Sequence, residues 1–356
     1  MSKFKKKEKK KFVRKNIRLK NRAFKDVDEF CDDEVVELKK SDVISEAGNA
    51  KSQKSDLILK TGRVMEVMSN HKCRVKIDGV FFDCTVSGRL KHINFRTRTI
   101  VAVGDFVKVD FSETPRVEEI MPRRNRLARF SGHNFQSEII LASNIDRIII
   151  TASYLEPALN LGLVDRYLCF SEIENLEAIV CINKIDLCRD EEELDKSLEY
   201  YENAGIKILK VSAETGRGIE DLKELLKNKD TVFSGHSGAG KSSLINKIQP
   251  GLNLRVSQIS YIHGKGQHTT SSGKLIGWNF GGHLADTPGI KTFGLYREHK
   301  PLIPKVFPGF INFSGSCKFD DCTHTHEKIC GVKQAVEEGE IPEERYNSYC
   351  RIWDSL

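Results

Sequence analysis

From Leu57 onward the chain alternates short apolar runs with turn-forming residues, whereas the residues before it are polar and highly charged. Short runs of β-branched and aromatic residues bounded by Gly, Asn or Asp are typical of β-strands. We expect such strands at 63–68, 73–77, 80–86, 100–111 and 117–121, with a bulge or turn at 104–105. Five short strands in this space predict a small Greek-key barrel of the OB type or, alternatively, an SH3-like barrel.

A different pattern begins near residue 147, where apolar runs alternate with segments of helical spacing. Strands are expected at 147–152, 177–182, 206–211 and around 232–233, and helices at 163–173, 191–204, 219–226 and around 244–248. Strands that alternate with helices require a parallel sheet covered on both faces. The stretch 122–126, which contains three arginines, is expected to be a basic linker between the barrel and this doubly wound sheet.

Charge is distributed unevenly along the chain. The formal net charge is +7, yet the first 25 residues contain thirteen Lys or Arg and one Glu, which leaves −5 for the rest. A basic segment attached to a slightly acidic body neutralises phosphates and gives largely sequence-independent affinity for nucleic acid. The alternative is a terminus that only aids solubility. Residues 1–55 are too polar to form a packed core, and we expect them to be disordered.

Composition also limits the cellular setting. No apolar run reaches membrane-spanning length, and the N-terminus is too basic and too poor in apolar residues for a signal peptide. We therefore expect a soluble, cytoplasmic protein, whose ten cysteines are buried apolar residues or metal ligands rather than disulfides. Because no coiled-coil heptad is present, we expect a monomer.

The clearest motif is G-x-x-x-x-G-K-[ST], formed by Gly235, Gly240, Lys241 and Ser242. An apolar run precedes it and helical spacing follows it, which is the strand-loop-helix context of a phosphate-binding loop. The glycines let backbone N–H groups point at phosphate, and the helix N-terminus adds its dipole. Lys241 can neutralise phosphate oxygens and Ser242 can ligate Mg²⁺. The motif predicts nucleotide binding.

Two motifs that precede this loop predict that the base is guanine. The strand expected at 177–182 runs into Asn183-Lys184-Ile185-Asp186. A carboxylate there can accept hydrogen bonds from guanine N1–H and the 2-amino group, which adenine lacks. We expect Asn183 to hold the base and the phosphate loop, and the Lys184 stem to cover the base. The next strand ends at Ser212-Ala213, where a backbone N–H can meet guanine O6.

A fourth motif, D-x-x-G, runs from Asp286 to Gly289. Asp286 is expected to reach Mg²⁺ through water, and the Gly289 N–H to contact the γ-phosphate. Between the phosphate loop and this motif lies a segment rich in Gly and Thr, 264–271. One of its threonines, Thr269 or Thr270, is expected to be the second protein ligand to Mg²⁺.

The order of the motifs is unusual. Ordinary small GTPases run from the phosphate loop through a switch threonine and D-x-x-G to N-K-x-D and S-A, whereas here the last two come first. A doubly wound sheet tolerates this because its ligand sits at the carboxyl ends of the strands, however these are connected. We therefore expect a circularly permuted GTPase, which hydrolyses GTP to GDP and phosphate. Its second switch leads toward the C-terminal residues, and we expect nucleotide-dependent motion there.

One catalytic group of ordinary GTPases is missing. The residue after Gly289 is Ile290, where Ras-like enzymes carry the glutamine that orients the attacking water. We therefore expect slow intrinsic hydrolysis that a partner or another residue assists. His268 is the candidate, and the alternative is that it only contacts RNA or the loop backbone. Lys241 and Asp286 complete the expected catalytic set.

Near the C-terminus, three cysteines and a histidine have the spacing of metal ligands. Cys317, Cys322, His324 and Cys330 match a tetrahedral Cys₃His structural zinc site with no open position for catalysis. His326 could replace His324, and the alternative to zinc is a set of unligated buried cysteines. Residues at helical spacing further on are expected to pack against this module rather than stack on bases. They are Tyr346, Tyr349, Cys350 and Trp353.

Together these motifs closely resemble the bacterial RsgA family of circularly permuted GTPases, over about residues 57–356. The resemblance implies a cytoplasmic GTPase that acts late in maturation of the 30S ribosomal subunit. It also implies binding to 16S rRNA near the decoding region, stimulation by the small subunit, and release after hydrolysis. The barrel and the zinc module would be the docking elements. One departure is Gln267, where the family usually has a basic residue.

The chain is thus expected to have four parts: a disordered basic extension (1–55), an OB-type barrel (56–122), a permuted P-loop GTPase domain (126–295) and a helical zinc-binding module (296–356). Expected cofactors are one zinc ion, and Mg²⁺ with GTP. Expected partners are 16S rRNA and the 30S subunit, with no membrane. The rival functions are large-subunit assembly and a non-catalytic module whose GTP site only switches affinity. The residues expected to contact the nucleotide are Asn183, Lys184, Ile185, Asp186, Ser212, Ala213, Gly235, His236, Ser237, Gly238, Ala239, Gly240, Lys241, Ser242, Ser243 and Gly289.

Overall fold

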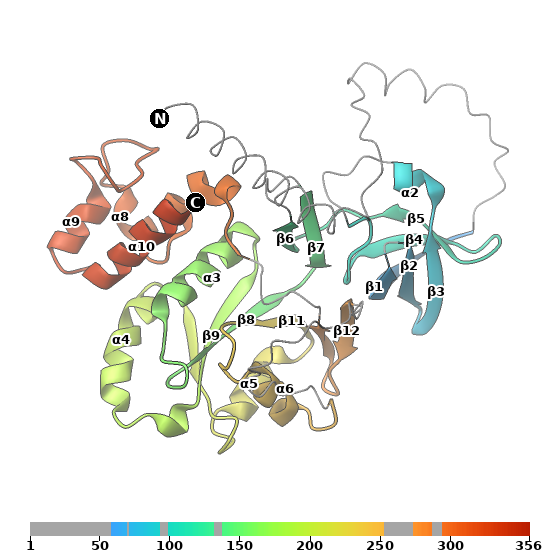
Figure 1. Cartoon of the computed structure of the whole chain (residues 1–356), viewed down its shortest axis with the longest axis horizontal. Helices are drawn as coiled ribbons and strands as arrows, with labels where there is room; N and C mark the ends of the chain where they lie inside the picture. Colours follow the sequence, from blue (N-terminus) through green and yellow to red (C-terminus); the bar gives the residue numbers. More distant parts are fainter. Residues whose placement is uncertain (1–57, 70, 93–98, 132–136, 253–272, 287–293) are drawn as a thin grey trace, which may run out of the picture. The chain divides into compact units, whose positions relative to one another are not determined.

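The computed structural model describes residues 58–356 apart from residue 70 and the segments 93–98, 132–136, 253–272 and 287–293 (Figure 1). The basic extension and four of the predicted site residues therefore lie outside the described part of the chain. Those four are His268, Thr269, Thr270 and Gly289. Within the described ranges, no helix is long and apolar enough to cross a membrane.

Five strands at the start of the described chain close into a barrel. They are β1 (Leu59–Ser69), β2 (Lys72–Ile77), β3 (Val80–Val86), β4 (Phe106–Asp110) and β5 (Arg116–Ile120). β1 pairs with both β2 and β4, and the β2–β3, β3–β5 and β5–β4 pairs complete the ring. Valines from several of these strands are fully buried inside it, among them Val64, Val75, Val107 and Val117. The closed ring confirms an OB-type barrel.

The turn predicted at 104–105 is confirmed, and the strand predicted over 100–111 is limited to β4. Only β4 is a strand, because the chain turns before it at Gly104, where φ is +91°, and at the fully buried Asp105. The Asp105 carboxylate accepts hydrogen bonds from the Ala102 N–H at 2.8 Å and from the Ser143 hydroxyl at 2.6 Å. It also accepts two from the Arg123 guanidinium, both at 2.7 Å. This set of bonds satisfies the buried charge and fixes the turn.

The predicted basic linker at 122–126 is likewise engaged rather than free. Arg123 pairs with Asp105, and Arg124 pairs with Asp146 at 2.7 Å. The chain then forms a two-stranded antiparallel sheet of β6 (Arg126–Ser131) and β7 (Ser137–Ser143), which the apolar pattern did not predict. Charge-assisted hydrogen bonds therefore attach the barrel to the next part of the chain.

Alternating strands and helices form the expected parallel sheet (Figure 1). In chain order they are β8 (Arg147–Ser153), α3 (Leu161–Ile173), β9 (Glu177–Asn183), α4 (Glu191–Asn203), β10 (Lys207–Lys210), α5 (Ile219–Leu226), β11 (Lys229–Ser234), α6 (Lys241–Ile248), β12 (Gly273–Gly277) and β13 (Gly282–Asp286). The strand order is β10-β9-β8-β11-β13-β12, and only β12 is antiparallel to its neighbour β13. β11 lies between strands that precede it in the chain and strands that follow it, as a permuted domain requires.

Both faces of this sheet are buried. Ile148 and Ile150 of β8 share one core with helices α3 and α4, whereas Ile149 packs on the other face with α5 and α6. Because side chains alternate between the faces of a strand, a strand covered on both sides must be apolar at every position. This explains why the parallel strands appear in the sequence as continuous apolar runs.

The sheet also continues into the barrel. β12 pairs antiparallel with β1, where Lys274 lies opposite Glu66 and Gly273 lies opposite Val67. The Lys274 ammonium is 2.8 Å from a Glu66 carboxylate oxygen. Main-chain pairing and an ion pair therefore join barrel and sheet at this edge.

Short helices form the C-terminal part. A 3-10 helix spans Arg297–Leu302, followed by α7 (Ile303–Val306), α8 (Ile311–Ser314), α9 (Gly331–Glu337) and α10 (Glu343–Ser355). The ring of Tyr349 in α10 is fully buried, with centroids 5.4 Å from Phe307 and 4.9 Å from Phe310. Tyr346 and Trp353 stack on it from either side along the helix. The expectation that these aromatic residues form core is confirmed.

A buried polar network joins α10 to helices α3 and α4 of the parallel sheet. The Arg345 guanidinium donates to Asp165 of α3 at 2.7 Å and also to the Tyr201 hydroxyl of α4. The Tyr201 hydroxyl is in addition 2.6 Å from Asp165. The Asp165 side chain is fully buried and that of Arg345 is 10% exposed. The network therefore depends on each member being present, since a buried charge without its partner is costly.

We expect Arg345→Met to lower the free energy of unfolding by about 3–5 kcal/mol, because it leaves the buried Asp165 without its cation. Denaturant titration measures the change. The matched control is Arg217→Met, which removes an arginine from an exposed pair with Glu191 and should cost at most about 1 kcal/mol. Equally small losses in the two variants would show that the network contributes little.

Candidate nucleotide-binding and zinc sites

The predicted phosphate loop connects β11 to α6 and needs its glycines. Gly235 has φ +135°, and a Cβ on it would lie 1.9 Å from the Thr151 carbonyl oxygen of β8. Gly240, immediately before α6, has φ +87°, and a Cβ there would lie 2.2 Å from Nδ2 of Asn183. No other residue type fits these two positions without displacing backbone or a buried side chain.

The lysine of this loop is held across it. The Lys241 ammonium donates hydrogen bonds of 2.7 Å to the carbonyl oxygens of Gly235 and His236. Lys241 and Ser242 are the first two residues of α6, where the helix dipole favours negative charge. Fixed positive charge, a helix N-terminus and a left-handed glycine turn therefore meet at one place, which is the chemistry of a phosphate site.

Asn183, at the end of β9, connects the phosphate loop to the S-A motif. Its amide nitrogen donates to the Ala239 carbonyl at 2.9 Å, and its amide oxygen accepts from the Ala213 N–H at 3.2 Å. The side chain is 1% exposed. Three segments that are far apart in the sequence therefore meet at a single buried amide, as the expected role of Asn183 requires.

The residues after Asn183 leave a carboxylate open to solvent. Lys184 adopts a left-handed conformation with φ +61°, and the Ile185 N–H donates to the Val211 carbonyl at 3.1 Å. Asp186 is exposed, and one of its carboxylate oxygens accepts a hydrogen bond from the Ser212 hydroxyl. That bond orients the carboxylate while its second oxygen can accept further donors.

Strand register brings the remaining motif to the same edge of the sheet. β11 and β13 are parallel with Thr231 opposite Leu284, so the same offset places Asp286 level with Phe233, just before the phosphate loop. Asp286 is exposed at the end of β13. All described motifs thus lie at the carboxyl ends of β9, β10, β11 and β13, around the point where the strand order reverses. Open α/β sheets bind ligands at such a point.

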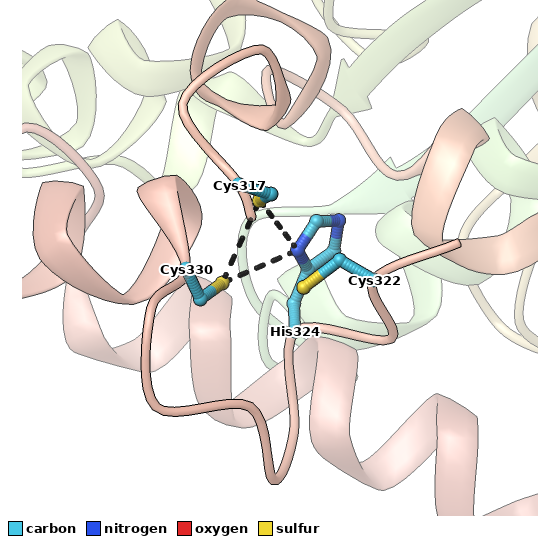
Figure 2. A group of neighbouring side chains, drawn as sticks. All are labelled: Cys317, Cys322, His324 and Cys330. Carbon is cyan, nitrogen blue, oxygen red and sulfur yellow. Dashed lines mark hydrogen bonds between the residues drawn. The ribbon is translucent and has the colours of Figure 1, made fainter. Parts of the chain in front are cut away.

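A second cluster lies in the C-terminal part. Figure 2 shows Cys317, Cys322, His324 and Cys330 turned toward one another, and their ligand atoms all lie within 4.8 Å of one another. The Cys317 and Cys330 sulfurs are 3.9 Å apart, and Nδ1 of His324 is 3.6 Å and 3.3 Å from them. Tetrahedral zinc with ordinary bond lengths separates two sulfurs by about 3.8 Å and a sulfur from a nitrogen by about 3.6 Å. The donor set fits a structural zinc ion.

Surrounding hydrogen bonds hold the loop that carries these donors. The hydroxyl of Tyr346 donates to the His324 carbonyl at 2.7 Å, and that of Tyr349 donates to the Thr323 carbonyl. Burial alone would raise the pKa of Glu327, but hydrogen bonds from the N–H and hydroxyl of Thr323 lower it to about 2. The loop is thereby tied both to α10 and to an ionised carboxylate.

Burial favours the neutral forms of the donors in the metal-free cluster. Burial raises the pKa of the Cys322 thiol to about 12 and lowers the pKa of His324, whose ring also hydrogen-bonds to the Pro304 backbone. Neutral imidazole is the form that ligates metal, and a metal ion deprotonates the thiols it binds. Of the two candidate histidines, His324 lies in the cluster, whereas the His326 side chain is 81% exposed and lies outside it.

Comparison with known proteins agrees with this geometry. The family model for RsgA GTPase matches residues 120–296. A small ribosomal subunit biogenesis GTPase RsgA from Flavobacterium psychrophilum is 38% identical over 284 residues, covering 78% of this chain and 87% of that protein. The one from Chlorobaculum parvum is 43% identical over 272 residues, covering 72% and 86%. The chain belongs to the RsgA family.

Solved structures agree with membership of the RsgA family. YjeQ from Thermotoga maritima has a TM-score of 0.66 and 33% identity, and the match covers 84% of this chain and 99% of that one. YloQ, a circularly permuted GTPase, has a TM-score of 0.64 and 27% identity, with coverage of 85% and 97%. The expected family, permuted fold and enzyme class are therefore confirmed, and this RsgA-family chain is a GTPase.

Sequence reasoning missed the contacts that support the site from outside the motifs. The Lys184 ammonium donates to the Glu156 carbonyl. Asp230, at the start of β11, contacts His283 of β13 and Arg63 of the barrel. Each contact joins distant segments, so no local pattern marks it. The only available signal was a charged residue, Asp230, at the edge of an apolar run.

Gly240→Ala should abolish GTP hydrolysis, because the new methyl group needs a strained backbone and collides with the Asn183 amide. Steady-state phosphate release measures the loss, and circular dichroism checks the fold. Gly277→Ala in β12 is the matched control, since a Cβ there has no neighbour within 4 Å. A Gly240→Ala enzyme that turned over at the Gly277→Ala rate would contradict the placement of this loop.

Cys330→Ser should reduce the zinc content, about one ion per wild-type chain, and should lower the thermal unfolding temperature. Cys169→Ser is the control, because Cys169 is buried in α3 outside the cluster. Metal analysis of the purified chains and thermal unfolding give the two readouts. Wild-type protein purified without zinc, or equal metal content in both variants, would rule out the site.

Proposed function

We propose that this GTPase acts in biogenesis of the small ribosomal subunit, late in maturation of the 30S particle. The proteins it resembles over most of their length are named as small ribosomal subunit biogenesis GTPases, which supports the first part of this proposal. The observation that carries the nucleotide part of the proposal is the buried Asn183 amide, which joins the phosphate loop to the S-A motif.

In the proposed complex, Asp186 accepts hydrogen bonds from guanine N1–H and the 2-amino group while Ser212 orients it. The Ala213 N–H, which donates to the Asn183 amide oxygen at 3.2 Å, would also be shared with guanine O6, and the Lys184 stem would cover the base. Gly235 to Ser243 enclose the phosphates, where Lys241 stabilises the charge of the transferring phosphoryl group. The placement of the motifs at one edge of the sheet supports these proposed roles.

Mg²⁺ would be held by the Ser242 hydroxyl and, through water, by Asp286, with Thr269 or Thr270 as the switch ligand. Bound with GTP, the ion neutralises phosphate charge during hydrolysis. The Gly289 N–H would sense the γ-phosphate. Ile290 cannot orient water, so we assign that task to His268 in the complex with the partner particle.

The barrel and the zinc module are the proposed contacts with 16S rRNA. The barrel exposes Phe81, 55% accessible, with the Lys76 ammonium 5.8 Å from its ring centroid. Between β3 and β4, the exposed Arg89 lies in the short helix α2 (Gly88–His92). Exposed aromatic rings beside basic groups suit stacking on bases and contact with phosphates. The basic extension, 1–55, would add salt-dependent affinity for RNA.

GTP-dependent switch order would favour docking, and hydrolysis stimulated by the subunit would favour release. The protein would work in the cytoplasm, where the subunits mature. It would act as a monomer.

Steady-state GTP hydrolysis with purified 30S subunits tests this function. We expect a large rise in kcat with 30S and none with 50S, and Lys241→Ala should remove the activity altogether. His268→Ala should lower the stimulated rate while GTP affinity stays the same. Stimulation by 50S alone would assign the protein to the large subunit, and stoichiometric binding without turnover on either particle would make it a non-catalytic switch.

A further inference from the structure

A single arginine of the barrel reaches the strand that precedes the phosphate loop. Arg63 of β1 forms an ion pair with Asp230 of β11, and their side chains are 17% and 12% exposed. The same guanidinium donates to the Asn144 carbonyl at 3.3 Å and lies 5.2 Å from the ring centroid of Phe106. A planar, always charged group that is stacked and bonded in this way has little freedom to move.

Asp230 is in turn bonded to both neighbours of β11. Asp146 lies just before β8. The Asp230 N–H donates to the Asp146 carboxylate at 2.8 Å, and the Asp230 carbonyl accepts from the Asp146 N–H at 2.9 Å. On the other side its carboxylate is 2.7 Å from Nδ1 of His283 in β13. Asp230 lies five residues before Gly235, and His283 lies three residues before Asp286. The carboxylate therefore fixes the N-terminal ends of β11 and β13. β11 leads into the phosphate loop, and β13 ends at the aspartate of D-x-x-G.

The charge of Asp230 depends on its partners His283 and Arg63, and we call these three side chains the junction between barrel and sheet. Burial alone would raise the pKa of Asp230, but the hydrogen bond with His283 and the charge of Arg63 lower it instead. The carboxylate is therefore ionised at neutral pH. Removing one partner from such a pair exposes the full desolvation cost of the remaining charge.

A second contact joins the same barrel strand to β12, the strand that follows the first predicted switch segment. β1 pairs with β12, and Glu66 of β1 bonds the Lys274 ammonium at 2.8 Å. β12 begins at Gly273, directly after the segment that contains the Gly- and Thr-rich loop, and it pairs with β13. One barrel strand thus contacts β11, which leads into the phosphate loop, and β12, which follows the first predicted switch segment.

We propose that Arg63 and Asp230 are positioning residues for GTP hydrolysis, which couple the barrel to the phosphate loop and to D-x-x-G through β11 and β13. This inference rests on the proposed nucleotide site. A ligand on the barrel would change the Arg63 contact, and with it the alignment of the two strand ends at the nucleotide. The coupling must also act in the opposite direction, because an equilibrium linkage between two sites is reciprocal.

Reciprocity gives a test that needs no ribosomal particle. Hydrogen exchange in the full-length chain is compared between the complexes with GDP and with a non-hydrolysable GTP analogue. In the wild type we expect exchange of β1 amides to differ between the two states by about fivefold or more, at the lower end of typical couplings. In Arg63→Met we expect that difference to disappear, and Arg63→Lys should restore part of it.

Arg116→Met is the matched control, because Arg116 lies on barrel strand β5 and pairs with Glu118, away from the junction. It should keep the nucleotide-dependent difference. Asp230→Asn provides a second route if Arg63→Met folds poorly, and it should also abolish the difference.

Two results would overturn the proposal: β1 exchange that does not depend on the nucleotide in the wild type, or a difference that survives in both Arg63→Met and Asp230→Asn. An equal loss in Arg116→Met would also overturn it, by showing general loosening of the barrel. The outcome is independent of the proposed ribosomal function. A coupled barrel in a protein that 30S subunits do not stimulate would contradict that function and leave the positioning role intact.

Discussion

The nucleotide site depends on one buried side-chain amide. Asn183 is the only described residue that hydrogen-bonds both to the phosphate loop, at Ala239, and to the S-A motif, at Ala213. Gly240 must be glycine because a Cβ there would occupy the position of that amide. The glycine pattern of one motif and the asparagine of another are therefore a single steric and hydrogen-bonding constraint.

Permutation of the chain is possible because this constraint acts in space and not along the sequence. β11 lies between β8, which precedes it, and β13, which follows it, so the motifs converge at one sheet edge in either chain order. The permutation does change what is attached to each end. The barrel now joins the sheet through β1 and β12, and the C-terminal module packs on α3 and α4 through the Asp165–Arg345 network. The parallel sheet is therefore in direct contact with the barrel through β12, and its helices α3 and α4 are in direct contact with the C-terminal module.

Much of this arrangement was predictable from the sequence, because apolar runs and motif spacing are local signals. The parallel strands β8 to β11, their helices and the Cys₃His donors lie where the pattern placed them, whereas β12 and β13 were not predicted. The β6–β7 pair was missed. The turn at 104–105 was predicted, but the contacts of the buried Asp105 with Arg123 and Ser143, which hold the residues before β4 out of the strand, were not. The Arg63–Asp230 pair was missed for the same reason. Ion pairs between distant segments leave no periodic signal, so only the folded chain reveals them.

The central claim, that the permuted motifs form one guanine-specific site, is tested most directly by the nucleotide preference of Asp186→Asn. Xanthine has an oxygen where guanine has its 2-amino group, so an asparagine amide at this position can donate to it, whereas it loses the carboxylate contact with guanine. Measured by phosphate release, kcat/KM for GTP should fall by about 100-fold and that for xanthosine triphosphate should rise above it. A variant that still prefers GTP would contradict the account.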